Sequence, residues 1–167
     1  MGNLLDALKG KAHSDCIFCD VTPEKGFNVV AQNDKFIAFH DRNPASKVHV
    51  LVIPKDHHRT CFASHTRPLA SCLNRRSGYC LPRRLVRFAA DLPFRSWNLG
   101  FHIPPFNSIN HLHLHVQVLP YRSIIRKLKY RIAEGHGSRS KGLSWFATLR
   151  QAISILEKGG RVGVLPC

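Results

Sequence analysis

The chain has 167 residues, 44% of them hydrophobic, and can bury the core of one domain of ordinary size. No apolar run approaches the ~20 residues needed to cross a bilayer, and no signal-peptide pattern follows Met1, so we expect a cytoplasmic or nuclear protein outside the membrane-spanning class. The net charge of +15 would by itself indicate a nucleic-acid partner, but the charge is unevenly distributed, which weakens that inference.

The N-terminal part of the chain predicts a short helix and then three strands. The helix is expected over Asn3–Lys9, where Asn3 can act as N-cap, and a Cys-x-x-Cys turn follows at residues 16–19. The expected strands are Phe27–Ala31, Phe36–His40 and Val48–Ile53. The last of these is apolar except for one histidine, which is typical of a central strand.

The segment Arg59–Arg95 differs in composition from the rest of the chain. It contains eight arginines, three of the six cysteines and one acid, and it has no lysine although ten occur elsewhere. Its net charge of +7 is almost half of the total, and no helical or strand period is sustained in it. Three explanations are open: a divergent helix, a disordered basic loop, or a stretch translated in the wrong frame, which the composition favours. We expect it to be the least ordered part of the chain.

The C-terminal part predicts two more strands and two helices. The expected strands are Trp97–Ile103 and His111–Leu119, and the expected helices are Tyr121–Ile132 and Ser144–Leu156. Residues 135–142, between the helices, are polar and contain glycines, which predicts a mobile linker. Since no repeat or domain boundary is visible, we expect residues 1–167 to form one α+β domain, an antiparallel sheet of about five strands with helices packed on one face.

Histidine alternates with apolar residues from His111 to Gln117, which reads His-Leu-His-Leu-His-Val-Gln. Alternate side chains of a strand point to opposite faces, so the three imidazoles would share one face at a spacing of roughly 6.6–6.8 Å. A strand that is merely polar on one side is the alternative, but Ser, Thr, Lys and Glu are the usual residues there. The pattern therefore indicates a site where one ligand group can contact two imidazoles.

This pattern resembles the His-φ-His-φ-His-φ-φ motif (φ hydrophobic) of the histidine triad superfamily of nucleotide hydrolases and transferases, with Gln117 replacing the last apolar residue. The preceding Gly100–Ser108 is similar to the branch that contains aprataxin and the smaller adenosine phosphoramidases. Residues 36–41 and 49–57 also match the family in order and spacing, so the resemblance covers roughly residues 16–58 and 97–120. It implies the histidine triad fold.

The resemblance implies that His113 is a nucleophile in the hydrolysis of adenosine 5′-phosphoramidate-type substrates to AMP. His113 would attack the α-phosphorus and form a nucleotidyl-imidazole, which water then resolves. Imidazole suits both steps because it is uncharged near pH 7 and makes a labile bond to phosphorus. By the same resemblance, His115 would donate to the phosphate oxygens and Ser108 would help to protonate the leaving group, although Ser108 could equally cap the loop backbone.

Other residues that match the family imply a binding site for a purine nucleotide of the AMP type. Asp41 would hold the ribose hydroxyls, because a carboxylate can accept two hydrogen bonds, and His49 would line the phosphate pocket. A turn residue and a core histidine are the respective alternatives. The expected substrate contacts also include Phe39, His40 and His102.

Cys16, Cys19, His57 and His111 offer two thiolates and two imidazoles, a set that suits tetrahedral zinc. The resemblance implies this ligand set, with His58 as a substitute for His57. Such a zinc would be structural, because no coordination position is left open. Free thiols are the alternative, since disulfides are not expected without an export signal.

Two other functions stay open. Removal of adenylate from DNA ends, as in aprataxin, is favoured by the basic charge and the loop Gly100–Ser108, but only Cys167 follows the triad where aprataxins carry a zinc finger. A nucleotide-binding or scaffold protein without turnover is opposed by the intact His113. The expected partner is the nucleotide substrate, and nucleic acid is not favoured as a partner. Whether the protein forms a homodimer stays open.

Overall fold

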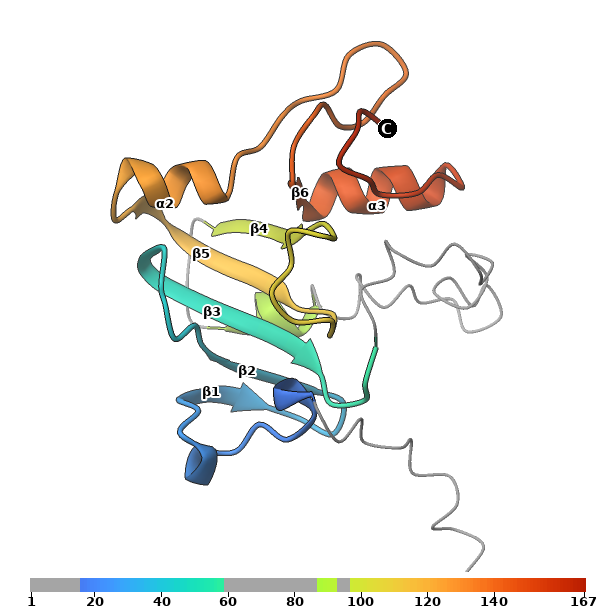
Figure 1. The fold of residues 1–167 in the computed structure, drawn as a ribbon. Helices are drawn as coiled ribbons and strands as arrows, with labels where there is room; N and C mark the ends of the chain where they lie inside the picture. Colours follow the sequence, from blue (N-terminus) through green and yellow to red (C-terminus); the bar gives the residue numbers. More distant parts are fainter. Residues whose placement is uncertain (1–15, 59–86, 93–96) are drawn as a thin grey trace, which may run out of the picture.

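The computed structural model describes residues 16–58, 87–92 and 97–167. Their framework is a six-stranded sheet in which all neighbouring strands are antiparallel, in the order β1-β2-β3-β5-β4-β6 (Figure 1). The strands are β1 (Val29–Gln32), β2 (Phe36–His40), β3 (Ser46–Pro54), β4 (Trp97–His102), β5 (Leu114–Tyr121) and β6 (Phe146–Thr148). The 3-10 turns are η2 (Ile17–Cys19) and η3 (Pro23–Lys25), and the α-helices are α2 (Ile124–Lys129) and α3 (Leu149–Glu157). The α+β class is confirmed.

The centre of the sheet is the pair β3 and β5. His115 lies opposite Leu51 and Gln117 lies opposite His49, so the side chains of His49, His115 and Gln117 project from the same face of the sheet. The apolar run of β3 accounts for its place, because a central strand is covered on both faces. Its last five residues are all buried.

The two faces of the sheet are covered differently. On one face, Leu149, Ala152, Ile155 and Leu156 of α3 pack with apolar side chains of the sheet that include Val50, Val52, Leu114 and Val116. On the other face, a smaller cluster forms around Phe18 of η2, whose ring lies 5.4 Å from that of Phe39. The histidines of β3 and β5 lie on this second face, beside the smaller cluster. The sheet thus separates the main core from the histidine side chains.

Several predicted boundaries are wrong, and the wrong start of the last helix has a clear cause. The expected helix Ser144–Leu156 is in fact β6, paired with β4, followed by α3. The helix begins after Thr148 because Thr148 and Gln151 form a capping box. Strand β5 begins at Leu114 rather than His111 and continues through Pro120 to Tyr121, and α2 is shorter than the expected Tyr121–Ile132.

Residues 135–142, expected to be a mobile linker, form a turn between two residues that pair with each other. Glu134 and Lys141 form an isolated antiparallel bridge. Lys141 is fully buried, and its ammonium donates to the carbonyls of Gly142 at 2.9 Å and Val164 at 3.1 Å. The buried Lys141 ammonium therefore holds this polar segment in a folded turn through its hydrogen bonds to two carbonyls.

Two sequence predictions fall largely outside the described residues: the helix Asn3–Lys9 and the segment Arg59–Arg95. Of the latter, residues 87–92 are described, and residues 87–90 are helical. Ala89 and Leu92 are buried in the main core, so this end of the segment packs against the sheet. No helix in the described part of the chain is long and apolar enough to cross a membrane.

Candidate active site

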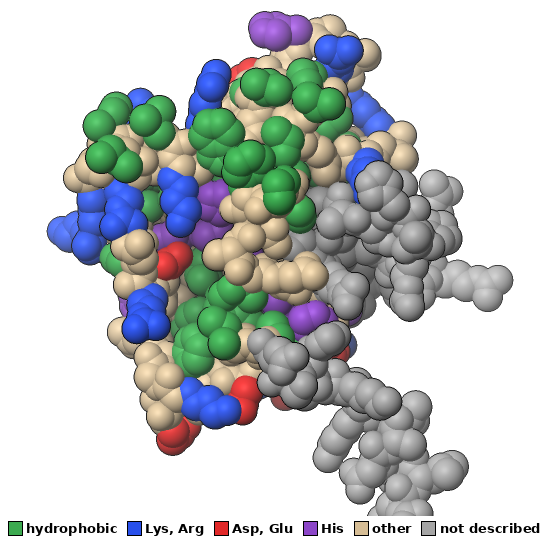
Figure 2. All heavy atoms as spheres, viewed as in Figure 1, with side chains coloured by type: hydrophobic (Ala, Val, Ile, Leu, Met, Phe, Trp, Pro, Cys, Tyr) green, Lys and Arg blue, Asp and Glu red, His purple; other side chains and the backbone are tan. Residues whose placement is uncertain are grey.

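A cleft of about 1040 Å³ opens on the histidine face of the sheet. It lies between the end of β2, the loop before β5 and the end of α2. Figure 2 shows histidine side chains recessed on this face near Lys and Arg side chains. The residues predicted from the sequence that line the cleft are Phe39, His40, Asp41, His102, Ser108, His113 and His115. The fold therefore gathers most of the predicted substrate residues around one space.

His113 is held in a single orientation by the backbone. Its Nδ1–H donates to the carbonyl oxygen of His111 at 2.6 Å, so Nε2 carries the lone pair. The side chain is buried apart from the edge that lines the cleft. Burial lowers the pKa of His113, which keeps its imidazole neutral near pH 7. A neutral imidazole with a free Nε2 is the form that can attack phosphorus.

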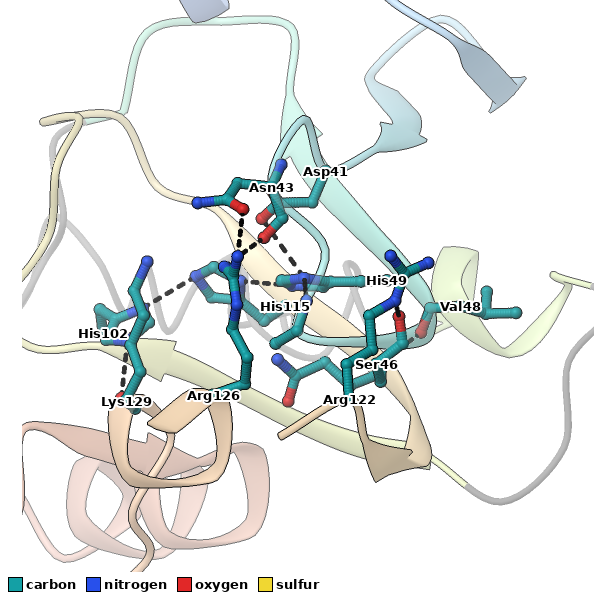
Figure 3. Close-up of polar contacts among 12 residues, drawn as sticks. Asp41, Asn43, Ser46, Val48, His49, His102, His115, Arg122, Arg126 and Lys129 are labelled. Carbon is teal, nitrogen blue, oxygen red and sulfur yellow. Dashed lines mark hydrogen bonds and ion pairs between the residues drawn. The ribbon is translucent and has the colours of Figure 1, made fainter. Parts of the chain in front are cut away.

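Three other histidines form a hydrogen-bonded chain that runs from the wall of the cleft to the residue behind it (Figure 3). The amide of Ala45 donates to His49 Nδ1 at 3.2 Å, and His49 Nε2 lies 2.9 Å from His115 Nδ1. His115 Nε2 lies 3.0 Å from His102 Nδ1, and His102 Nε2 lies 3.1 Å from the carbonyl oxygen of Lys129. One end is a backbone donor and the other a backbone acceptor. Every Nε2 in this histidine chain is therefore protonated and donates toward Lys129.

This histidine chain is uncharged because it is buried. Burial lowers the pKa of His49 to about 4 and that of His102 to about 4, and it lowers the pKa of His115 well below its usual value. The Tyr130 ring seals the group, with its centroid 5.6 Å from that of His49, 4.8 Å from His102 and 5.3 Å from His115. The neutral state is what allows each imidazole to donate once and accept once.

Asp41 lies between this histidine chain and the mouth of the cleft. Its Oδ1 accepts from the amide of Asn43 at 2.7 Å, which is a turn contact, and its Oδ2 lies 3.4 Å from His49 Nδ1. Arg126 of α2 holds the same turn by hydrogen bonds to Asn43. The carboxylate is thus both a turn residue and part of the cleft lining. His49 itself lies behind His115 and does not line the cleft.

Cys16, Cys19, His57 and His111 come together from three separate parts of the chain, with one potential ligand atom of each lying within 4.8 Å of the others. His111 Nε2 donates to the Pro54 carbonyl at 2.9 Å, which leaves Nδ1 facing the sulfur atoms of Cys16 at 3.5 Å and Cys19 at 3.8 Å. His57 Nδ1 lies 3.1 Å from Cys19 Sγ. His58 is exposed and lies outside this group. The donor set and the outer carbonyl contact fit a tetrahedral metal site.

A second group, Asp41, His49 and His115, also has atoms close enough for a metal. Its two imidazoles, however, hydrogen bond to each other at 2.9 Å. The nitrogens that would bind a metal are therefore already occupied by the histidine chain, and we assign no metal to this group.

Lys129 and Tyr130 complete the site but did not stand out in the sequence. Both lie at the C-terminal end of α2, where the expected helix had its apolar residues at other positions. Lys129 lines the cleft, and Tyr130 is buried against the histidines. Their roles depend on where α2 ends against the sheet, which helical periodicity does not indicate.

The fold and the histidine cluster define the class of the protein. Residues 15–130 match the family model described as Scavenger mRNA decapping enzyme C-term binding, and the chain belongs to the histidine triad superfamily.

Two relatives and one solved structure illustrate the similarity. The chain is 37% identical to the bifunctional adenosine 5′-phosphosulfate phosphorylase/adenylylsulfatase HINT4 of Arabidopsis thaliana, over 70% of this chain and 78% of that one. It is 36% identical to the adenosine 5′-monophosphoramidase HINT3 of Xenopus tropicalis, over 85% and 87% respectively. A crystal structure of the aprataxin ortholog Hnt3 in complex with DNA matches with a TM-score of 0.48 and 24% identity, over 76% of this chain and 66% of that one.

Proposed function

We propose that this protein hydrolyses adenosine 5′-phosphoramidate-type substrates to AMP through a covalent adenylate on His113. The observation that carries the proposal is the hydrogen bond from His113 Nδ1 to the His111 carbonyl, which leaves Nε2 unprotonated on a side chain that lines the cleft. The names of the relatives support it, because both act on adenosine 5′-phosphate derivatives. Those names differ in the leaving group, which is an amine in one and sulfate in the other.

In the first step, His113 Nε2 attacks the α-phosphorus. A phosphorus–nitrogen bond forms, and the bond to the leaving group breaks with its electron pair. A leaving amine takes up a proton, for which Ser108 at the cleft is the candidate donor. The adenylated imidazole carries positive charge, and the His111 carbonyl, which already accepts from Nδ1–H, stabilises it.

In the second step, water attacks the same phosphorus and the phosphorus–nitrogen bond breaks, its electron pair returning to His113 Nε2. The proton that the water loses restores the Ser108 hydroxyl, and AMP leaves with His113 neutral again. His115 can stabilise the phosphate in both steps if its Nε2–H turns from His102 toward a phosphate oxygen. His49 continues to hold His115 Nδ1 during this exchange. Asp41, at the mouth of the cleft, is suited to accept the ribose hydroxyls. Phe39 and His40 complete this side of the nucleotide site.

We further propose that Cys16, Cys19, His57 and His111 hold one structural zinc. Both imidazoles present Nδ1 to the sulfur atoms, and the Pro54 carbonyl fixes the His111 tautomer. A zinc in this place would tie η2 to the sheet. It would also steady the His111 carbonyl, which positions His113.

The test is mass spectrometry of the reaction with adenosine 5′-phosphoramidate, quenched during turnover. We expect adenylate on His113 and on no other residue. His113→Ala should lose turnover by several orders of magnitude while AMP binding persists, because the two-step route has lost its nucleophile. His136→Ala, which removes an exposed histidine of the C-terminal hairpin, is the control. Near-normal turnover by His113→Ala would exclude the proposed nucleophile.

A further inference from the structure

Lys129 places a positive charge on the wall of the cleft. It is the last residue of α2 and lines the cleft together with His113, His115 and Ser108. Figure 3 shows its side chain running beside His102. Among the described residues its ammonium forms no ion pair with a carboxylate, and it lies 5.8 Å from the centroid of the Tyr130 ring. The charge is therefore available to a ligand.

The histidines around this ammonium are uncharged. The positive charge of Lys129 lowers the pKa of His49, His102, His113 and His115, in addition to the larger effect of their burial. The other cations that line the cleft are Lys25, which pairs with Asp20, and Arg42. Among the cations that line the cleft, Lys129 is thus the one whose field reaches all four of these neutral histidines.

We infer that Lys129 selects substrates by the charge of the leaving group and favours an anionic oxygen leaving group, sulfate or phosphate, over a neutral amine. The inference rests on the proposed function, since it concerns the leaving group of the same reaction. When His113 Nε2 attacks adenosine 5′-phosphosulfate, the bond from phosphorus to the bridging oxygen breaks and sulfate leaves with the electron pair. Sulfate needs no proton, but negative charge develops on it as the bond breaks. An ammonium stabilises that charge, whereas a departing amine gains little from it.

Lys129 allows a clean test because its two contributions to the site come from different atoms. The carbonyl that accepts from His102 is backbone, so a side-chain substitution leaves the histidine chain anchored. Lys129→Gln removes the charge at similar length, and Lys129→Arg retains it. Lys127→Gln is the matched control, because it removes one exposed lysine from the same helix and does not line the cleft.

The measurement is kcat/KM for adenosine 5′-phosphosulfate divided by kcat/KM for adenosine 5′-phosphoramidate. We expect Lys129→Gln to lower this ratio by about 10- to 100-fold, somewhat less than the loss of a buried oxyanion donor because the lysine is exposed. Lys129→Arg should keep most of the ratio, and Lys127→Gln should leave it unchanged. Salt at roughly 1 M should lower the ratio of the unsubstituted protein, because the screening length falls to about 3 Å.

A ratio unchanged by Lys129→Gln, or lowered equally by Lys127→Gln, overturns the inference. Binding to His113→Ala supplies a second test that needs no turnover. There, Lys129→Gln should weaken adenosine 5′-phosphosulfate binding about tenfold more than AMP binding, and an equal effect on both overturns the inference. If the unsubstituted protein turns over neither substrate, the proposed function fails, while this pair of binding measurements still decides the role of Lys129.

Discussion

His115 has a single hydrogen on Nε2, and in this structure His102 accepts it. A phosphate oxygen in the cleft would compete for the same hydrogen, so binding of substrate exchanges one acceptor for another. Because His102 is neutral and a phosphate is charged, the charge-assisted hydrogen bond is the stronger of the two. The histidine chain can therefore hold His115 in position before substrate arrives and release it without a change in protonation.

His115→Ala should slow turnover less than His113→Ala does. The substitution removes a hydrogen-bond donor but leaves the nucleophile, and the loss of one oxyanion donor costs roughly 10²–10³ in rate. Single-turnover rates with the phosphoramidate measure the effect without the contribution of product release. A loss as large as that of His113→Ala would show that His115 does more than stabilise the phosphate.

Stability should depend on pH through the buried histidine His102. Its pKa in the folded protein is about 4, below the 6.5 of an unperturbed histidine, so the unfolded chain binds more protons between these values. Stability is then fully present above about pH 6.5 and falls as the pH drops toward 4, by up to about 3 kcal/mol for this residue. Urea unfolding at pH 7 and pH 4.5 measures the fall.

His102→Gln is the informative variant for this measurement. Its amide can accept from His115 and donate to the Lys129 carbonyl, as His102 does, but it does not titrate. The variant should fold and lose less stability on acidification than the unsubstituted protein. An identical loss in both would assign the pH dependence to other groups.

At the scale of elements, the pairing of β4 with β6 requires a glycine at position 100. A Cβ at Gly100 would overlap the Ala147 carbonyl and the Phe146 ring. Gly100→Ala should therefore destabilise the protein by about 1–3 kcal/mol, as overpacking of a core does. Denaturant unfolding measures the cost. Gly163→Ala is the control, because a Cβ there meets no atom within 4 Å; equal stability of the two variants would contradict the close packing of β6.

The capping box of α3 is visible in the sequence, but the apolar periodicity predicts an earlier start for the helix. Phe146, Leu149, Ile153 and Leu156 share a helical spacing, which predicted one helix from Ser144. Thr148 and Gln151, three residues apart, mark the true start. The three residues before Leu149 are free to pair with β4 as a strand. Here a local capping pattern was more informative than the apolar period.

For the molecule as a whole, the α+β class and the antiparallel sheet could be predicted from the sequence, because the alternation of polar and apolar residues and the apolar runs directly reflect the burial of side chains. It placed His111 and His113 in a regular strand, whereas both precede β5. Their side chains are oriented by contacts distant in sequence or by the backbone: Pro54 for His111 and the His111 carbonyl for His113. The histidine chain needed the tertiary fold, because the carbonyl of Lys129 reaches His102 only when α2 packs at the sheet.

The group of Cys16, Cys19, His57 and His111 connects the N-terminal turn, the loop after β3 and the segment before β5, so its metal should stabilise the fold as a whole. Protein prepared without chelator should carry about one zinc per chain, and Cys19→Ser should lose the zinc and lower the melting temperature. Since none of the four side chains lines the cleft, single-turnover rates of the fraction that stays folded should change much less than in His113→Ala. Cys167→Ser, outside the group, is the control. Metal-free protein of full stability would exclude the proposed zinc.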